Sequence, residues 1–146
     1  MLQKLRERSG SESGFTLVEL LVVMLILGIL AAIAIPAFFN QRDKARDADA
    51  KSQARTAQTA IETYATDNNG EYLNATPAKL QAIEPTLNEA GANLTVPRAE
   101  AGAYTVSVAS DNTPNVFRIL RETDGTSSLT CATANNDGCP SDGTWD

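Results

Sequence analysis

The most prominent pattern in the chain is an uninterrupted apolar run close to its N-terminus. The run from Leu20 to Phe39 contains twenty residues and no charge. As an α-helix rising about 1.5 Å per residue, it would span about 30 Å, the thickness of the hydrocarbon core of a bilayer. The pattern predicts a membrane-spanning helix over residues 15–39, preceded by a polar leader over residues 1–14. Pro36 lacks an amide hydrogen and predicts a bend or local unwinding in this helix.

After Phe39 the helical pattern continues and becomes amphipathic. Five apolar positions alternate spacings of four and three, which places them on one stripe of a helix: Ala50, Ala54, Ala57, Ile61 and Tyr64. One helix is therefore expected from Phe15 to about Thr66, with residues 40–66 turning this stripe to the core and charged residues to solvent. Asp47 belongs to the predicted charged side, four residues before Lys51, at the spacing of a favourable ion pair.

The rest of the chain is predicted to be a connection followed by a small sheet. Residues 67–102 begin with turn-forming residues and contain one short helix, Pro77 to about Ile83, capped by Thr76. Three segments with strand-like alternation follow, separated by turn sequences: Ala103–Ala109, Val116–Glu122 and Ser127–Ala132. They predict an antiparallel meander over residues 103–132, and residues 133–146 are predicted to be a C-terminal loop. The expected fold class is α+β, with residues 40–146 as a globular head in which helix packs on sheet.

Composition narrows the range of functions. The formal net charge is −6, and removing the leader, which carries +1, leaves −7. Nucleic-acid binding through net charge is disfavoured for so acidic a protein, although the net charge says nothing about a local patch. The chain contains no histidine, the commonest general base and metal ligand, and no other catalytic constellation emerges. We therefore expect neither an enzyme nor a cofactor.

The C-terminal loop contains the residues that remain candidates for special chemistry. Cys131 and Cys139 have seven residues between them and predict a disulfide in an exported protein, worth roughly 2.5 kcal/mol for so short a loop. A zinc pair is the weaker alternative, because neither a histidine nor CxxC spacing accompanies them. The Asp and Asn residues at 135–137 and 142 could bind calcium, but they fit no EF-hand and are interpreted as turn residues. Trp145 is either a packing plug or an exposed contact.

The junction between leader and apolar run reads Gly14-Phe15-Thr16-Leu17-Val18-Glu19. A carboxylate such as Glu19 is costly in an apolar helix unless it has a partner, and an amine released at Phe15 by cleavage would be one. At these residues the chain resembles the prepilins of the type IV pilin superfamily, which also includes the pseudopilins of type II secretion. The resemblance is specific over Gly14 to Pro36 and loose beyond Tyr64.

The resemblance implies how the protein is processed and assembled. A prepilin peptidase would cut between Gly14 and Phe15 and then N-methylate Phe15. Glu19 would neutralise the new amine of a neighbouring subunit during assembly. Gly28 and Pro36 match helix-weakening positions, between which the helix often unwinds in assembled filaments. The family also includes major pseudopilins with a calcium loop at the C-terminus, so calcium binding stays an alternative for the Asp and Asn residues at 135–137 and 142.

An ordinary secretory signal is the main alternative for the N-terminus. Ala32 and Ala34 resemble a signal-peptidase site after an apolar run. Against this interpretation, Glu19 would interrupt the apolar region of a signal peptide, and the run continues to Phe39. Charge bias does not settle the orientation, so we place the C-terminal part outside the cytoplasmic membrane because of the cysteine pair and the leader resemblance.

These observations predict a structural subunit of a type IV pilus or a related filament. The apolar helices would leave the membrane lipid and bundle in the filament core. The expected partners are other copies of the chain, the prepilin peptidase and an inner-membrane assembly machinery. The subunit would be a single-pass membrane protein before assembly and part of an extracellular or periplasmic filament afterwards. The alternatives are a type II secretion pseudopilin and a single-span anchored binding protein that never polymerises; the cysteine pair resembles the disulfide-closed end of many pilins and favours the pilus.

Overall fold

The computed structural model describes residues 14–145, so the predicted leader lies outside the described residues except for Gly14. The chain divides into two compact units, one ending at Phe38 and one starting at Phe39, and each is described by itself. Helix α1, Leu17–Asp67, runs through both units. The second unit adds helix α2, Pro77–Ile83, two 3-10 turns, η1 at Pro85–Asn88 and η2 at Gly91–Asn93, and four strands.

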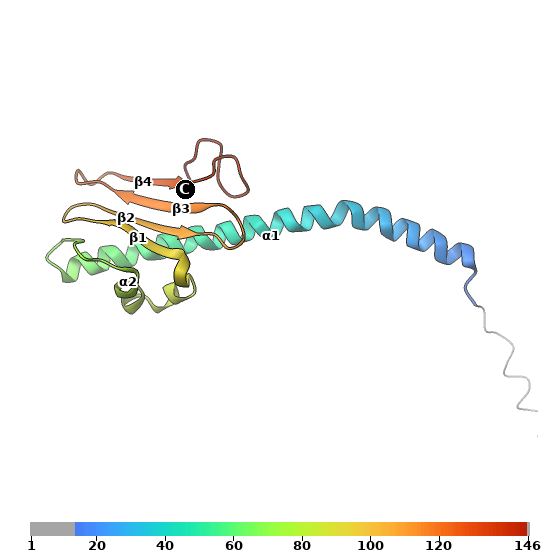
Figure 1. The fold of residues 1–146 in the computed structure, drawn as a ribbon, viewed down its shortest axis with the longest axis horizontal. Helices are drawn as coiled ribbons and strands as arrows, with labels where there is room; N and C mark the ends of the chain where they lie inside the picture. The colour runs from blue at the N-terminus through green and yellow to red at the C-terminus, as the bar shows by residue number, and fades with distance from the viewer. Residues whose placement is uncertain (1–13, 146) are drawn as a thin grey trace, which may run out of the picture. The chain divides into compact units, whose positions relative to one another are not determined.

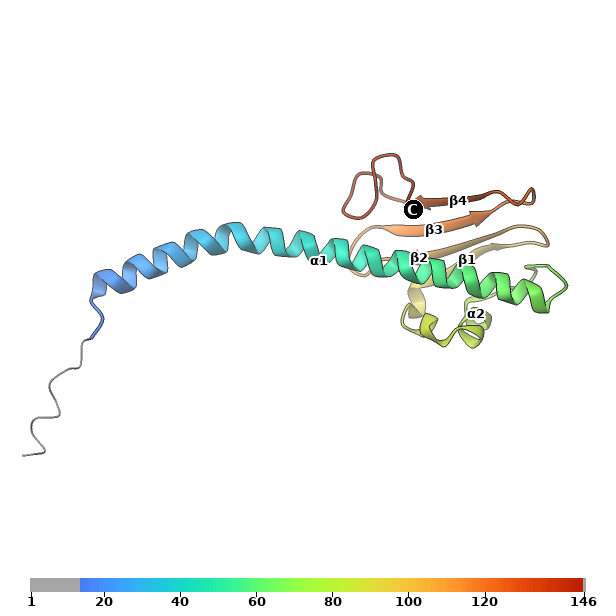
Figure 2. The ribbon, with the colours of Figure 1, turned by 180° about the vertical axis from the view of Figure 1, so that it is seen from behind.

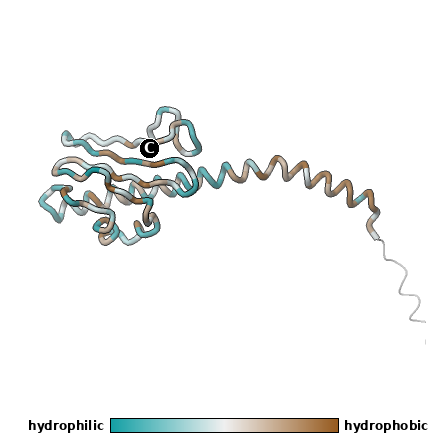
Figure 3. The backbone as a smooth tube through the Cα atoms, in the orientation of Figure 1, coloured by the Kyte–Doolittle hydropathy of each residue, from teal (hydrophilic) through white to brown (hydrophobic). Residues whose placement is uncertain are grey.

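Within the described residues, the first unit is an apolar helical segment whose large side chains are exposed. Its large hydrophobic residues are all exposed, from Phe15 at 82 % to Phe38 at 61 %. Among the described residues, α1 is long and apolar enough to cross a membrane, and this half of α1 is the brown part of the tube in Figure 3. Pro36 lies inside α1, which stays helical past it. The unwinding predicted between Gly28 and Pro36 concerns assembled filaments and stays a prediction.

The second unit is built around a four-stranded antiparallel sheet in the order β1-β2-β3-β4 (Figure 1). The strands are β1, Leu94–Ala99; β2, Tyr104–Ala109; β3, Val116–Arg121; and β4, Ser127–Cys131. The last three match the predicted meander; burial alternates along β3, whereas in β2 the polar Thr105 and Ser107 are buried as well as the apolar residues. Tyr104, Val106, Phe117 and Ile119 are fully buried. The α+β fold class is therefore confirmed.

Strand β1 was not predicted, because it lies inside the segment expected to be a connecting loop. Its sequence contains Pro97, which cannot donate to a ladder and is tolerated at an edge or a bulge. Both conditions hold here. β1 is an edge strand, and its pairing with β2 shifts register between Thr95 and Arg98, on either side of Pro97. The sheet thus gains a fourth strand through an irregular edge that local propensity argues against.

The head half of α1 lies across one face of the sheet, as seen from behind in Figure 2. The five predicted stripe residues are all buried, and Ala54, Ala57 and Ile61 are at 0 % exposure. The small alanine side chains let the helix backbone approach the sheet closely. In the core of the head, aromatic and branched side chains of the strands therefore pack against a helix face formed largely by alanine.

The connection after α1 follows its predicted capping chemistry. Asn69 and Gly70, both with positive φ, end the helix. The Thr76 hydroxyl accepts a hydrogen bond from the Lys79 amide at 3.4 Å and caps α2. Leu80 of α2 and Leu87 of η1 are fully buried. These short helices therefore close the core beside β1.

Candidate assembly site and the C-terminal loop

The N-terminus of α1 is closed by a reciprocal pair of side chains, Thr16 and Glu19. The Thr16 hydroxyl accepts from the Glu19 amide at 3.2 Å, and Glu19 Oε2 accepts from the Thr16 amide at 2.9 Å and from its hydroxyl at 2.8 Å. This is a capping box, in which the N-cap and the third helical residue satisfy each other's backbone donors. In the single subunit the partner of Glu19 is therefore Thr16, whereas the sequence interpretation considered the amine of Phe15.

Gly14 and Phe15 lie ahead of the helix, outside any regular secondary structure, and both are exposed. The peptide bond between them is thus outside the hydrogen-bonded part of α1. Gly28 lies within α1, and a Cβ added there would meet nothing within 4 Å. Packing inside one subunit does not require glycine at this position, and the predicted helix-weakening role of Gly28 stays a prediction.

Asp47 is the residue whose environment the sequence interpretation missed. It is at 0 % exposure, on the sheet side of α1, and no ion pair with Lys51 is present. Its carboxylate accepts from the Thr113 hydroxyl at 2.7 Å, from the Asn115 side-chain amide at 2.6 Å and from the Gly138 backbone amide at 2.8 Å. One carboxylate therefore ties α1 to the β2–β3 loop and to the C-terminal loop at once.

The ionisation of Asp47 reflects these partners. Burial by itself raises the pKa of the Asp47 carboxyl, but the hydroxyls of Ser110 and Thr113, the Gly138 amide and the Asn115 side chain stabilise the anion. The net result is a pKa below the ordinary value for aspartate. No local periodicity could reveal this site, because its donors lie far away along the chain.

The C-terminal loop is fixed at several points besides Asp47. Cys131 at the end of β4 is joined to Cys139 by a disulfide, with Cα atoms 5.9 Å apart. Trp145 is 2 % exposed, packs edge-on against Phe117 and donates its indole N–H to the Thr130 carbonyl at 2.8 Å. Trp145 is thus a packing plug, which resolves the alternative left open by the sequence.

The Asp and Asn residues considered for calcium make contacts within the protein. Both Asp142 oxygens accept from Thr144, through its amide at 3.1 Å and its hydroxyl at 2.7 Å. The Asn136 carbonyl accepts from the Asn115 side chain at 3.0 Å. Asn135 and Asp137 have positive φ and shape turns. These contacts agree with the interpretation of this segment as turn-forming.

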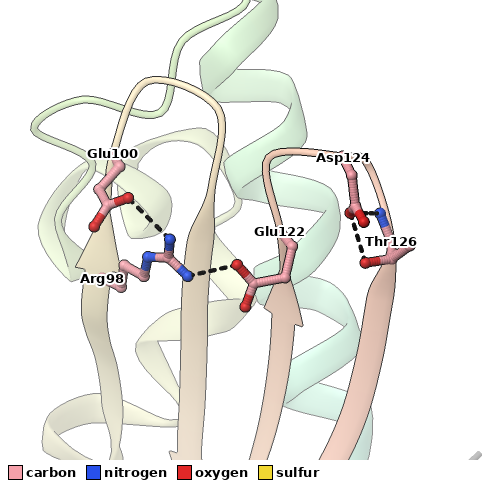
Figure 4. A network of polar contacts seen from close by, with 5 residues as sticks. All are labelled: Arg98, Glu100, Glu122, Asp124 and Thr126. Atoms are coloured by element: carbon pink, nitrogen blue, oxygen red, sulfur yellow. Dashed lines mark hydrogen bonds and ion pairs between the residues drawn. The ribbon is translucent and has the colours of Figure 1, made fainter.

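Two further polar networks tie the opposite end of the head together. The Glu62 carboxylate on α1 accepts from the hydroxyls of Tyr72 and Tyr104, at 2.7 and 2.9 Å. Burial and the Glu62 carboxylate raise the pKa of both tyrosines. Figure 4 shows Arg98 between Glu100 and Glu122, at 2.9 and 2.8 Å, which links the β1–β2 turn to the end of β3. These contacts order the two hairpins.

Asp124 stabilises the neighbouring turn, between β3 and β4. Its carboxylate accepts from the amide and the hydroxyl of Thr126, at 2.9 and 2.7 Å (Figure 4). These bonds hold the pKa of Asp124 below its usual value. The β3–β4 turn is therefore closed by a local Asx-type interaction.

Comparison with known proteins assigns the chain to a protein family. Residues 10–35 match the prokaryotic N-terminal methylation motif, a range that includes Gly14, Phe15, Glu19 and Gly28. The type II secretion system core protein G of Aeromonas hydrophila is 31 % identical over 109 residues, which are 75 % of this chain and 73 % of that protein. The chain belongs to the type IV pilin superfamily.

Pilins are also among the similar proteins, over different shares of the chain. A fimbrial protein of Neisseria meningitidis is 32 % identical over 108 residues, 73 % of this chain and 61 % of that protein. The type IV major fimbrial protein FimA of Dichelobacter nodosus is 45 % identical over 56 residues, 38 % of this chain and 36 % of that protein. The protein is a structural pilin subunit, and its relatives include both pilins and a secretion-system core protein.

Proposed function

We propose that this pilin is a subunit of a type IV pilus. The observation that carries the proposal is the C-terminal loop, which is closed by the Cys131–Cys139 disulfide and fixed to α1 through Asp47. This arrangement resembles the disulfide-closed end of many pilins. The apolar half of α1 and the methylation motif fit membrane anchoring before assembly.

The N-terminus would be processed before it assembles. A prepilin peptidase would cut the exposed bond between Gly14 and Phe15 and methylate the new amine of Phe15. The C-terminal head would lie outside the cytoplasmic membrane. Partners in this stage would be the peptidase, the inner-membrane assembly machinery and the surrounding lipid.

Glu19 would then direct assembly. Both bonds from Thr16 go to Oε2, and within residues 14–145 Oε1 has no hydrogen-bond donor. The Phe15 amine of a neighbouring subunit could therefore bind Oε1 while the capping box of α1 stays intact. A charge in apolar surroundings is strongly destabilising without a partner, so this pairing would fix the axial register of subunits.

The apolar surface of α1 would supply most of the association energy. In the membrane this surface contacts lipid tails, and in a filament it would contact the same surface of other subunits. Because lipid is as apolar as leucine, the gain comes from close helix packing more than from removal of water. Water is excluded from both states, which keeps the Glu19 pairing strong.

A type II secretion pseudopilin is the second candidate, because of the extended match to core protein G. Deletion of the gene in its host, with rescue by the wild-type chain, separates the two. We expect sheared surface filaments to disappear and the export of folded secreted enzymes to continue. Loss of enzyme export with unchanged surface filaments would refute the pilus assignment in favour of the pseudopilin.

A further inference from the structure

The two flanks of the head half of α1 differ in charge: one carries Asp49 together with Arg46, and the other carries a row of three cations. Asp49 and Gln53 lie one turn apart on one side of the helix. Lys51 and Arg55 lie one turn apart on the other, because an offset of two residues is about 200° around a helix. Lys44, seven residues before Lys51, continues the second side. The buried alanine stripe runs between these flanks and packs on the sheet.

The flank that carries Asp49 borders a groove. Its cavity has a volume of about 410 Å³ and is lined by residues from α1, from the η1–η2 segment and from the end of β2 and the turn after it, including Asp49, Glu89 and Asp111. We call this cavity the acidic groove. One cation, Arg46, also lines it, but its guanidinium is paired with Asp43 at 3.2 Å.

A buried acceptor in the same groove has no partner. The Oε1 atom of Gln53 is inaccessible to solvent and accepts no hydrogen bond within the described part of the chain. Asn93, also in the lining, donates its side-chain amide to Asp111 at 2.7 Å. The groove thus offers the carboxylates of Asp49 and Glu89, acceptors that a cationic hydrogen-bond donor complements.

The other flank supplies such donors. Lys51, Arg55 and the exposed Lys44 form the basic flank, and none of them has a carboxylate partner within residues 14–145. Lys51 Nζ lies 5.3 Å from the centroid of the Phe117 ring, and Arg55 Cζ lies 5.3 Å from that of Trp145. These cation–π contacts orient the two side chains without neutralising them.

We propose that the acidic groove of one copy of this chain receives the basic flank of the next copy. The occupant is a second copy because the complementary charges are both present in this chain: Asp49, Glu89 and Asp111 line the groove, and the cations of the basic flank lie on the other side of α1. A contact between two different surfaces of identical subunits is heterologous, and it propagates into an open helical array unless its rotation closes a ring. The inference rests on the proposed filament function and names the lateral contact between heads.

Charge reversal tests this contact. In the full-length chain, Glu89→Lys places a cation in the groove, and Arg55→Glu places an anion on the basic flank. Each single variant should lower the yield of sheared filaments at least about tenfold, because like charges then oppose each other. The double variant Glu89→Lys/Arg55→Glu restores opposite signs and should recover most of the yield. Glu71→Lys makes the same charge change at an exposed turn outside the groove and should assemble normally.

Cross-linking gives an independent measurement. A zero-length carbodiimide joins a lysine to a carboxylate only when the two are in contact. In wild-type filaments we expect dimers whose peptides join Lys44 or Lys51 of one copy to Glu89, Asp49 or Asp111 of another. Monomer unfolding measured by circular dichroism should be the same in all variants, which excludes misfolding as the cause of a low yield.

The outcomes separate the two proposals. Wild-type filaments with unaffected single variants, or a double variant no better than the singles, would overturn the groove contact and leave the filament function standing. Filaments cross-linked through other residues would do the same. A wild-type chain that is processed but forms no filament would overturn both.

Discussion

Replacing Asp47 by alanine should remove the anchor of the C-terminal loop. The variant leaves the Gly138 amide and the Thr113 hydroxyl without their acceptor. The Asn115 side-chain amide loses one acceptor but still donates to the Asn136 carbonyl. A buried donor without a partner costs about 1–3 kcal/mol. Both groups are only part-buried, so the expected loss in the free energy of unfolding of the head is about 2–4 kcal/mol, below twice the upper value.

The Asp47→Asn variant separates hydrogen bonding from charge. The asparagine oxygen can still accept from the Gly138 amide while its nitrogen donates to the Thr113 hydroxyl. The expected loss is therefore only about 1 kcal/mol, the difference between a charged and a neutral acceptor. Asp49→Ala, an exposed acid two residues along the same helix, is the matched control and should stay within about 0.5 kcal/mol of wild type.

Thermal unfolding of the detergent-solubilised full chain, followed by circular dichroism, measures these effects. A loss of 2–4 kcal/mol corresponds to a fall in Tm of roughly 10–20 °C for a head of this size. The pKa of Asp47 is lowered in the folded protein, so its stabilisation is present above the ordinary Asp pKa of about 3.9 and is lost as pH falls below it. This acid-dependent loss should be smaller in Asp47→Asn. An Asp47→Ala protein with wild-type Tm at pH 7 would refute the anchoring role.

Four further outcomes are expected. A Cβ at Gly138 would lie 2.5 Å from Asp47 Cβ, so Gly138→Ala should lower stability by about 1–3 kcal/mol, whereas Gly102→Ala, with its closest contact at 3.5 Å, should be nearly neutral by the same unfolding assay. Glu19→Ala should still lose its leader, as measured by intact mass, but yield few filaments in electron micrographs; a wild-type count would dismiss the assembly role. Gly14→Val should keep the leader. If this variant migrates on a gel like the processed wild-type chain, the proposed cut between Gly14 and Phe15 is contradicted. Non-reducing peptide mapping of the isolated protein should find both cysteines joined within one chain, and two free thiols would contradict the structure.

Much of the head was predictable because its signals are local. The alanine stripe, the Thr76 cap and the alternation of the last three strands each depend on neighbours a few residues apart, and all three are present. Strand β1 was missed because Pro97 opposes a strand locally. Only pairing with β2, through an edge bulge, makes its extended conformation favourable.

The two polar sites show where sequence reasoning could and could not go further. The Thr16–Glu19 pair has the spacing of a capping box, a local signal that was available in the sequence. Asp47 offers no such signal. Its donors lie 66 to 91 residues further along the chain, and the charged pattern of the helix assigns it to solvent. A buried carboxylate of this kind is defined by tertiary structure alone.

The alanine stripe also determines how the head can change by mutation. An alanine at 0 % exposure, such as Ala54 or Ala57, has no side chain beyond Cβ to lose, so truncation there opens almost no cavity. Every larger residue must instead push the sheet away from the helix, against several strands at once. The buried alanine positions of α1 should therefore tolerate almost no larger residue. Substitutions at this interface should be tolerated mainly among the strand side chains that pack on the helix.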